Sequence, residues 1–392
     1  MRLTIETKAA ALDVEEWNRL AEATGNLYAS AEWLRFSEEI EDGLCGYYLE
    51  VRDGRGALRG ALPAFLVNRP LNVNYSLSKH FSDTAEGQDD RPHLLLGGSR
   101  GYHAGYLLSP SDSNGDEILS SLLDGVESLS PQLPENSVSF WPFVDTETAA
   151  RLQRIYGTDP RLVEAQSTIA VDATGWTGYL EGLSGRRRYK IRREREEFAT
   201  SGMQVVDLAL SDCLEEVGRL MAMTQNRYGF TMTGKQMTDL MRVQNRAFNG
   251  AGLVHGCYLE GEMIGCAVFY AFGGTYNGRA VGFDYDRLPG VGEYFEISIY
   301  HAIERATELG LSTVNLGTAA HNGKTLRGAK LSLLWMVATG TDAWARETAR
   351  LGNAATLGSI LHQASGPERL HLEDATAAER WLSRTVTTDG PS

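Results

Sequence analysis

The spacing of apolar and polar residues across positions 281–317 predicts a strand, a turn, an amphipathic helix and a second strand. Within the helical part, apolar side chains recur at intervals of three and four residues and so share one face: Phe295, Ile299, Ala302, Ile303 and Ala306. Leu309-Gly310-Leu311 is typical of a helix end, and residues 312–316 are expected to form the second strand.

The turn before this helix reads Arg287-Leu-Pro-Gly290-Val291-Gly292, which fits the pattern R-x-x-G-x-G. Its two glycines allow a ligand to approach the backbone closely, and the N–H groups of residues 290–292 would face a phosphate at a helix N-terminus. The pattern therefore predicts a phosphate site formed by Arg287, Gly290, Val291 and Gly292. An ordinary glycine-rich turn between a strand and a helix is the alternative.

A faint internal repeat predicts the domain organisation. Tyr48-Leu49-Glu50 begins a strand–turn–strand pattern that returns at Tyr258-Leu259-Glu260, and two predicted helices precede each copy. Chance recurrence of a common hairpin pattern is the alternative. We expect an α/β (α+β) fold of two similar domains, each a mixed central sheet flanked by helices. The predicted boundaries are 1–172, 173–345 and a helical C-terminal extension over 346–392.

Composition narrows the class of protein. A chain of 392 residues with 42% hydrophobic and 22% charged residues is typical of a globular protein with two or three domains. No apolar run reaches the roughly 18 residues that a membrane span needs, and the first residues lack the apolar core of a signal peptide. The four cysteines are scattered and the histidines show no ligand spacing. We therefore expect a cytoplasmic protein with no metal site.

The net charge of −14 argues against a general nucleic-acid coat, but its distribution qualifies that conclusion. Residues 186–195 hold seven basic side chains against one acidic side chain, Glu194. This predicted helix is a candidate contact for a polyanion, with Arg188 and Arg192 as the residues expected to meet phosphates. A solvated helix surface with internal ion pairs is the alternative.

The order of predicted elements between residues 203 and 340 resembles the GNAT acyltransferase fold. Together with the tandem copy and the basic helix, it is similar to the Fem-type branch of that fold, the aminoacyl-tRNA-dependent ligases of peptidoglycan bridges and some peptide antibiotics. Motifs support this likeness over residues 160–340 and architecture alone supports it before them. The matching segments are Arg188-Tyr-Lys-Ile-Arg192-Arg193, Ala302-Ile-Glu-Arg-Ala306 to Gly310, Val314-Asn-Leu-Gly317 and His321 to Lys330.

The resemblance implies amide formation on an amine, and the chemistry of that reaction suggests three catalytic residues. Lys330 matches the position of a functional lysine in the family and would stabilise the oxyanion or the leaving group. Asp284, before the turn, would accept the amine proton directly or through water. Tyr228 would donate a proton or contact the substrate. A surface lysine, a turn-capping aspartate and a packing tyrosine are the respective alternatives.

The sequence leaves two possible acyl donors, aminoacyl-tRNA and acyl-CoA. Fem-type ligases that use tRNA generally lack a good R-x-x-G-x-G turn, whereas this chain has one. The resemblance and the basic helix favour aminoacyl-tRNA, and the turn favours acyl-CoA; no tightly bound cofactor is expected. The acceptor would be a small-molecule or peptide amine of cell-wall or specialised-metabolite assembly. A binding module that has lost its chemistry is the third alternative.

Overall fold

The computed structural model describes residues 1–81, 88–109, 113–339, 349–364, 370–371, 374–376 and 381, and its strands join in one mixed sheet. In chain order the strands are β1 (Arg2–Glu6), β2 (Cys45–Arg52), β3 (Leu58–Val67), β4 (His93–Leu96), β5 (Leu107–Leu108), β6 (Val138–Val144), β7 (Arg161–Ala170), β8 (Gln204–Ala209), β9 (Leu253–Leu259), β10 (Glu262–Phe272), β11 (Thr275–Phe283), β12 (Thr313–Thr318) and β13 (Lys330–Ala338).

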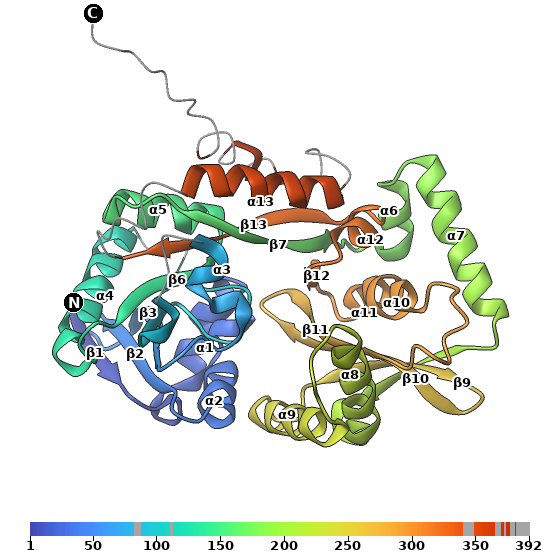
Figure 1. Cartoon of the computed structure of the whole chain (residues 1–392), viewed down its shortest axis with the longest axis horizontal. Helices are drawn as coiled ribbons and strands as arrows, with labels where there is room; N and C mark the ends of the chain where they lie inside the picture. Colours follow the sequence, from blue (N-terminus) through green and yellow to red (C-terminus); the bar gives the residue numbers. More distant parts are fainter. Residues whose placement is uncertain are drawn as a thin grey trace, which may run out of the picture.

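Helices flank this sheet in two lobes, one at the left and one at the right of Figure 1. They are α1 (Val14–Ala23), α2 (Ala31–Ile40), α3 (Leu77–Phe81), α4 (Gly115–Ser128), α5 (Thr146–Tyr156), α6 (Gly175–Glu181), α7 (Gly185–Thr200), α8 (Leu214–Arg227), α9 (Gly234–Ala247), α10 (Glu293–Phe295), α11 (His301–Glu308), α12 (His321–Thr325) and α13 (Ala349–Ala364). Among the described residues, no helix combines the length and the apolar character that crossing a membrane requires.

The two lobes repeat one plan, as the sequence pattern predicts. The helix pair α1 and α2 precedes the hairpin β2–β3, and the pair α8 and α9 precedes the hairpin β9–β10. Each lobe also contains one parallel strand pair, β4 with β6 and β11 with β12. The expectation of tandem domains with mixed sheets and flanking helices is therefore confirmed.

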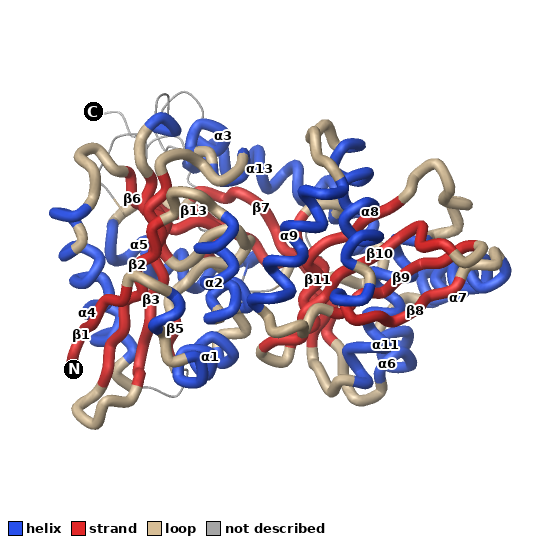
Figure 2. The backbone as a smooth tube through the Cα atoms, turned by 90° about the horizontal axis from the view of Figure 1, so that it is seen from below, coloured by secondary structure: helices blue, strands red, loops and turns tan. Residues whose placement is uncertain are grey.

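The two halves are joined through the middle of the sheet. The strand order is β1-β2-β3-β4-β6-β13-β7-β12-β11-β10-β9-β8, so β13 lies between β6 and β7. Figures 1 and 2 show β7 running from one lobe towards the other. The boundary predicted at residue 172 follows β7 directly, whereas β13 comes from beyond that boundary and pairs with strands that precede it.

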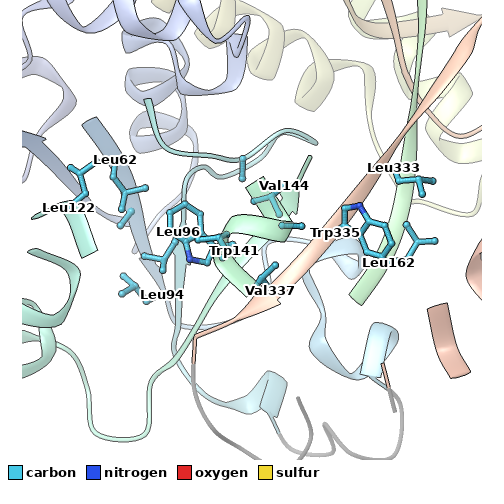
Figure 3. Packing of buried hydrophobic residues seen from close by; sticks show 14 of the residues in the cluster. Leu62, Leu94, Leu96, Leu122, Trp141, Val144, Leu162, Leu333, Trp335 and Val337 are labelled. Carbon is cyan, nitrogen blue, oxygen red and sulfur yellow. The ribbon is translucent and has the colours of Figure 1, made fainter. Parts of the chain in front are cut away.

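Side chains of β13 complete the core of the N-terminal lobe. Leu333, Trp335 and Val337 are fully buried and belong to one apolar cluster with residues from β3, β4 and β6. Figure 3 shows this cluster, including Leu62, Leu94, Leu96, Trp141 and Val144. An alternating run of three buried large side chains removes apolar surface from water along the whole strand.

The helix predicted after residue 292 runs from α10 to α11, with a π-helical segment between them. Glu296–Tyr300 forms that π segment, which the helical spacing of apolar residues did not reveal. Of the predicted apolar face, Ile299, Ala302, Ile303 and Ala306 are fully buried. A single π turn inserted in an α-helix often marks a functional site, because it redirects the side chains around it.

Candidate functional site

A cavity opens where the parallel strands β11 and β12 part. They pair only from Thr275 to Asn277 and from Thr313 to Asn315. The residues that follow on each strand, Gly278 to Val281 and Leu316 to Thr318, line a cavity of about 580 Å³. The parting of two parallel strands leaves side chains and backbone groups of both strands facing a shared space, which favours ligand binding.

The N-terminal lobe has a corresponding parting, and its own chain forms a further bridge there. β4 and β6 pair from His93 to Leu95, and beyond them Ala104 forms a parallel bridge to Val144. The Ala104 N–H also donates to the carbonyl of Phe143 at 3.1 Å. Beside this bridge, Ala104 also lines a separate hollow of about 540 Å³ in the N-terminal lobe.

Both lobes supply polar side chains to the cavity, and none of the described residues that line it is acidic. The N-terminal lobe contributes Tyr28, Arg100 and Tyr102. The C-terminal lobe contributes apolar residues and six polar residues: Tyr228, Arg279, Tyr294, Ser298, Thr318 and Lys324. Burial raises the pKa of Tyr294 to about 12. Its hydroxyl is therefore protonated at neutral pH and can donate a hydrogen bond.

Lys324 is the lysine that the structure brings to this cavity. Its side chain, in α12, is buried, and Nζ donates to the carbonyls of Gly317 (3.3 Å) and Thr318 (2.9 Å). Burial lowers the pKa of Lys324 to about 8. The ammonium form is therefore retained at neutral pH, but its burial lowers the stability of the folded protein. A cation held in a desolvated cavity stabilises a developing oxyanion strongly.

The backbone beside Lys324 is held in an uncommon conformation. Ala319 and Ala320 both line the cavity and have φ values of 60° and 51°, in the left-handed region. Each alanine there costs about 1–2 kcal/mol relative to the ordinary helical region. Such strain persists where surrounding contacts fix the chain, and it gathers at functional sites.

Of the three predicted catalytic residues, only Tyr228 lines the cavity; its side chain follows α8 and is exposed. Lys330 begins β13 opposite Thr168 of β7 and is exposed in a separate hollow. Asp284 is buried, and its carboxylate lies 3.5 Å from the guanidinium of Arg219 in α8. Asp284 is therefore not among the residues that line the cavity, and its role as proton acceptor stays a prediction.

The predicted phosphate turn is present, but a carboxylate of the chain occupies it. Gly290 and Gly292 have φ values of 81° and 93°, as a turn of this kind requires. The N–H groups of Gly290 and Val291 donate to Oε1 of the buried Glu293 at 2.6 and 3.1 Å. Arg287 is paired with Glu262. Two of the three N–H groups that a phosphate would use are thus engaged by Glu293.

The basic helix α7 divides its positive side chains between structural and exposed roles. Arg195 pairs with Glu296 at 2.9 Å and with Glu304 at 2.8 Å, which anchors α7 to the helix after the turn. Arg188 donates to the carbonyl of Leu183 at 2.7 Å and so caps the chain before α7. Arg192, the other predicted phosphate ligand, is exposed beside a shallow hollow on another face.

A different set of basic residues on α7 lines a hollow of about 370 Å³. Arg186, Arg187 and Lys190 face it, together with the paired residues Arg327 and Glu194. Arg327 also lies over the ring of Phe295, with Cζ 3.0 Å from the ring centroid. Tyr294, which lines the cavity between the lobes, packs against Phe295 with 5.3 Å between the ring centroids. A series of packed side chains thus runs from the basic hollow to the cavity between the lobes.

One group of potential metal ligands occurs among the described residues: Asp207, His255 and His301. His301 Nε2 lies 2.7 Å from Asp207, His255 Nε2 lies 2.9 Å from the Tyr276 hydroxyl, and Arg305 lies 3.1 Å from the second oxygen of Asp207. Their hydrogen bonds already engage these atoms, and Arg305 adds positive charge. The sequence could not reveal this group, because strand pairing brings Asp207 opposite His255.

Sequence reasoning missed several residues that the structure brings to the cavity or the turn. These are Lys324, Ser298, Arg279 and Glu293. The segment from His321 to Lys330 did indicate a functional lysine, but two lysines lie within it, and only the fold separates the buried one from the exposed one. For Glu293 the signal was an acidic residue directly after the turn, where it can accept from free N–H groups.

Comparisons with known proteins identify the family and show which solved structures share the fold. The FemAB-like family model, described as peptidoglycan biosynthesis/recognition, matches residues 8–343. No curated protein matches the chain in sequence. Among solved structures, FemX has a TM-score of 0.59 at 14% identity and covers 85% of this chain and 95% of its own. The C-terminal domain of a putative lysylphosphatidylglycerol synthetase from Agrobacterium fabrum has a TM-score of 0.52 at 11% identity, over 90% of this chain and 97% of its own. The chain belongs to the FemAB-like family.

Proposed function

We propose that the enzyme transfers an aminoacyl group from aminoacyl-tRNA to an amine acceptor of cell-wall or specialised-metabolite assembly. The reaction takes place in the cavity between the lobes. One observation carries the choice of donor: the Glu293 carboxylate accepts from the N–H groups of Gly290 and Val291. A coenzyme A pyrophosphate would have to displace this buried anion and compete for the same donors.

The position of the basic hollow supports tRNA as the donor. Arg186, Arg187 and Lys190 present positive charge at the N-terminal end of α7, where nucleic-acid phosphates would be attracted. Arg327 of this hollow packs on Phe295, and Phe295 packs on Tyr294, which lines the cavity between the lobes. Tyr294, an aromatic residue of the cavity lining, is suited to the unpaired 3′ end of a nucleic acid, whose bases stack on such rings.

The chemistry follows from the groups in the cavity. The amine attacks the ester carbonyl, a C–N bond forms, and the carbonyl oxygen becomes an oxyanion that the Lys324 ammonium stabilises. The C–O bond to the tRNA ribose then breaks, the amine loses a proton and the ribose hydroxyl gains one. The hydroxyls of Tyr228 and Tyr294 line the same space and can donate hydrogen bonds to the substrate.

Binding assays at several salt concentrations test the donor. Aminoacyl-tRNA is expected to bind the wild type with a steep salt dependence, and acetyl-CoA is expected to leave the melting temperature unchanged. Arg186→Gln with Lys190→Gln should lower the slope of log K against log salt by about two, since two phosphate contacts are lost. Arg193→Gln is the matched control, because Arg193 lies on α7 paired with Glu197, outside the hollow. Acetyl-CoA binding with no tRNA binding would overturn the proposal.

A further inference from the structure

Arg279 is a cation of the cavity without an acidic partner among the described residues. It lies on β11, two residues beyond the last pair with β12, and is half-buried. Its guanidinium lies over the ring of the buried Trp33, with Cζ 5.2 Å from the centroid. Its Nε donates to Oε1 of Gln244 at 3.1 Å. A ring and a neutral amide thus orient the guanidinium and leave its charge uncompensated.

The second arginine of the cavity provides the contrast. Arg100 lines the same space, but it is paired with Glu41. Burying a cation away from water costs free energy unless an anion faces it, so an arginine without a carboxylate favours an anionic ligand. Because no described residue that lines the cavity is acidic, no carboxylate of the lining repels such a ligand.

Ser298 is a second, independent indication that a polar ligand enters this cavity. The π segment places Ser298 at the cavity wall, where the residue is only 4% exposed. Its hydroxyl oxygen has no hydrogen-bond partner among the described residues. Buried hydroxyls are normally paired, and an unpaired one costs about 1–3 kcal/mol. A ligand that reaches Ser298 would supply the missing partner.

We propose that the acceptor carries an anionic group, a carboxylate or a phosphate, which Arg279 binds while its amine faces Lys324. This assignment rests on the proposed function, because it takes the cavity as the site of aminoacyl transfer. The planar guanidinium matches both anions with two parallel hydrogen bonds. The donor's phosphates have their own basic residues on α7, so Arg279 is available to the acceptor.

Titration of the full chain with succinate and with inorganic phosphate tests the site directly. At constant ionic strength, at least one of these probes should raise the melting temperature of the wild type. Arg279→Gln should bind that probe about tenfold more weakly, since a charge-assisted hydrogen-bond pair is lost. Arg242→Gln is the control, because Arg242 is an exposed arginine of α9 outside the cavity. Protection by succinate alone identifies a carboxylate, and protection by phosphate alone identifies a phosphate.

Two further results separate this assignment from the choice of donor. Arg279→Lys keeps the charge without the planar fork, so it should lose most of the probe affinity even if Arg279→Gln does not fold. No protection of the wild type by either probe, or equal protection of wild type and Arg279→Lys, would overturn the assignment. Anion binding through Arg279 without tRNA binding would instead overturn the choice of aminoacyl-tRNA as the donor, and the anion site would be retained.

Discussion

Lys324 shows how one residue combines a cost in stability with a chemical role. Its ammonium is buried among backbone carbonyls of residues 317 and 318, and burial lowers its pKa to about 8. Lys330, six residues later, begins a strand and is exposed. The sequence resemblance indicates a segment with a functional lysine, but the choice between the two depends on which side chain the fold buries.

Replacement of Lys324 should separate it from Lys330 in catalysis. Lys324→Ala is expected to reduce the rate of aminoacyl transfer by roughly 10²–10³-fold, the effect of losing one oxyanion donor. The wild-type rate should also fall as the pH rises through about 8, where the ammonium loses its proton. Lys330→Ala is the control and should keep nearly full activity. A larger loss in Lys330→Ala than in Lys324→Ala would return the catalytic role to Lys330.

The same residue predicts how stability depends on pH. The pKa of Lys324 is about 8 in the folded protein and 10.5 in its reference state, so between these values the unfolded chain binds more protons. Its unfavourable contribution, about 3 kcal/mol at most, is full below pH 8 and disappears as the pH rises towards 10.5. Lys324→Met should therefore stabilise the protein at pH 7, with a gain that shrinks by pH 10 in urea denaturation.

At the scale of elements, the turn before α10 shows that a motif and its function can separate. The conformation that the glycines predict is present, with positive φ at Gly290 and Gly292. Its N–H groups, however, bind Glu293. Periodicity located the helix that follows and most of its buried face, but it could not predict which acceptor takes these N–H groups or where the π turn falls.

Substitution of Gly290 tests whether the turn has a structural role alone. Gly290→Val should lower the free energy of unfolding by about 1–2 kcal/mol, because a branched residue is strained at positive φ. A Cβ built there meets no atom within 4 Å, so the expected cost is that of the backbone conformation. Affinity for aminoacyl-tRNA should stay unchanged in the same variant. Loss of donor binding would show that residue 290 contacts the donor after all.

At the scale of the molecule, the repeated plan was visible in the sequence, but the joining of both lobes through one continuous sheet was not. The hairpin patterns at Tyr48 and Tyr258 indicate two similar units. The position of β13 between β6 and β7 depends on pairing between residues more than 160 apart. Local spacing holds no information on such pairing, so the boundary predicted at residue 172 stays a prediction.

A fragment of residues 1–172 should therefore not fold alone. It lacks β13, whose side chains Leu333, Trp335 and Val337 complete its core, and it would expose β6 and β7 along their paired edges. Circular dichroism and hydrogen exchange are expected to show an unfolded or aggregated fragment. Adding the fragment 173–392 should restore protection in β6 and β7. A fragment that unfolds cooperatively by itself would contradict this view.

The place of β13 also sets the order of events during synthesis. Because the strand that closes the first lobe ends at Ala338, that lobe stays incomplete on the ribosome until most of the second lobe has been made. Apolar surface on β6 and β7 is exposed throughout that time, and such surface favours aggregation and chaperone binding. The cavity between the lobes is thus assembled last, and no nascent chain shorter than about 340 residues holds a complete site.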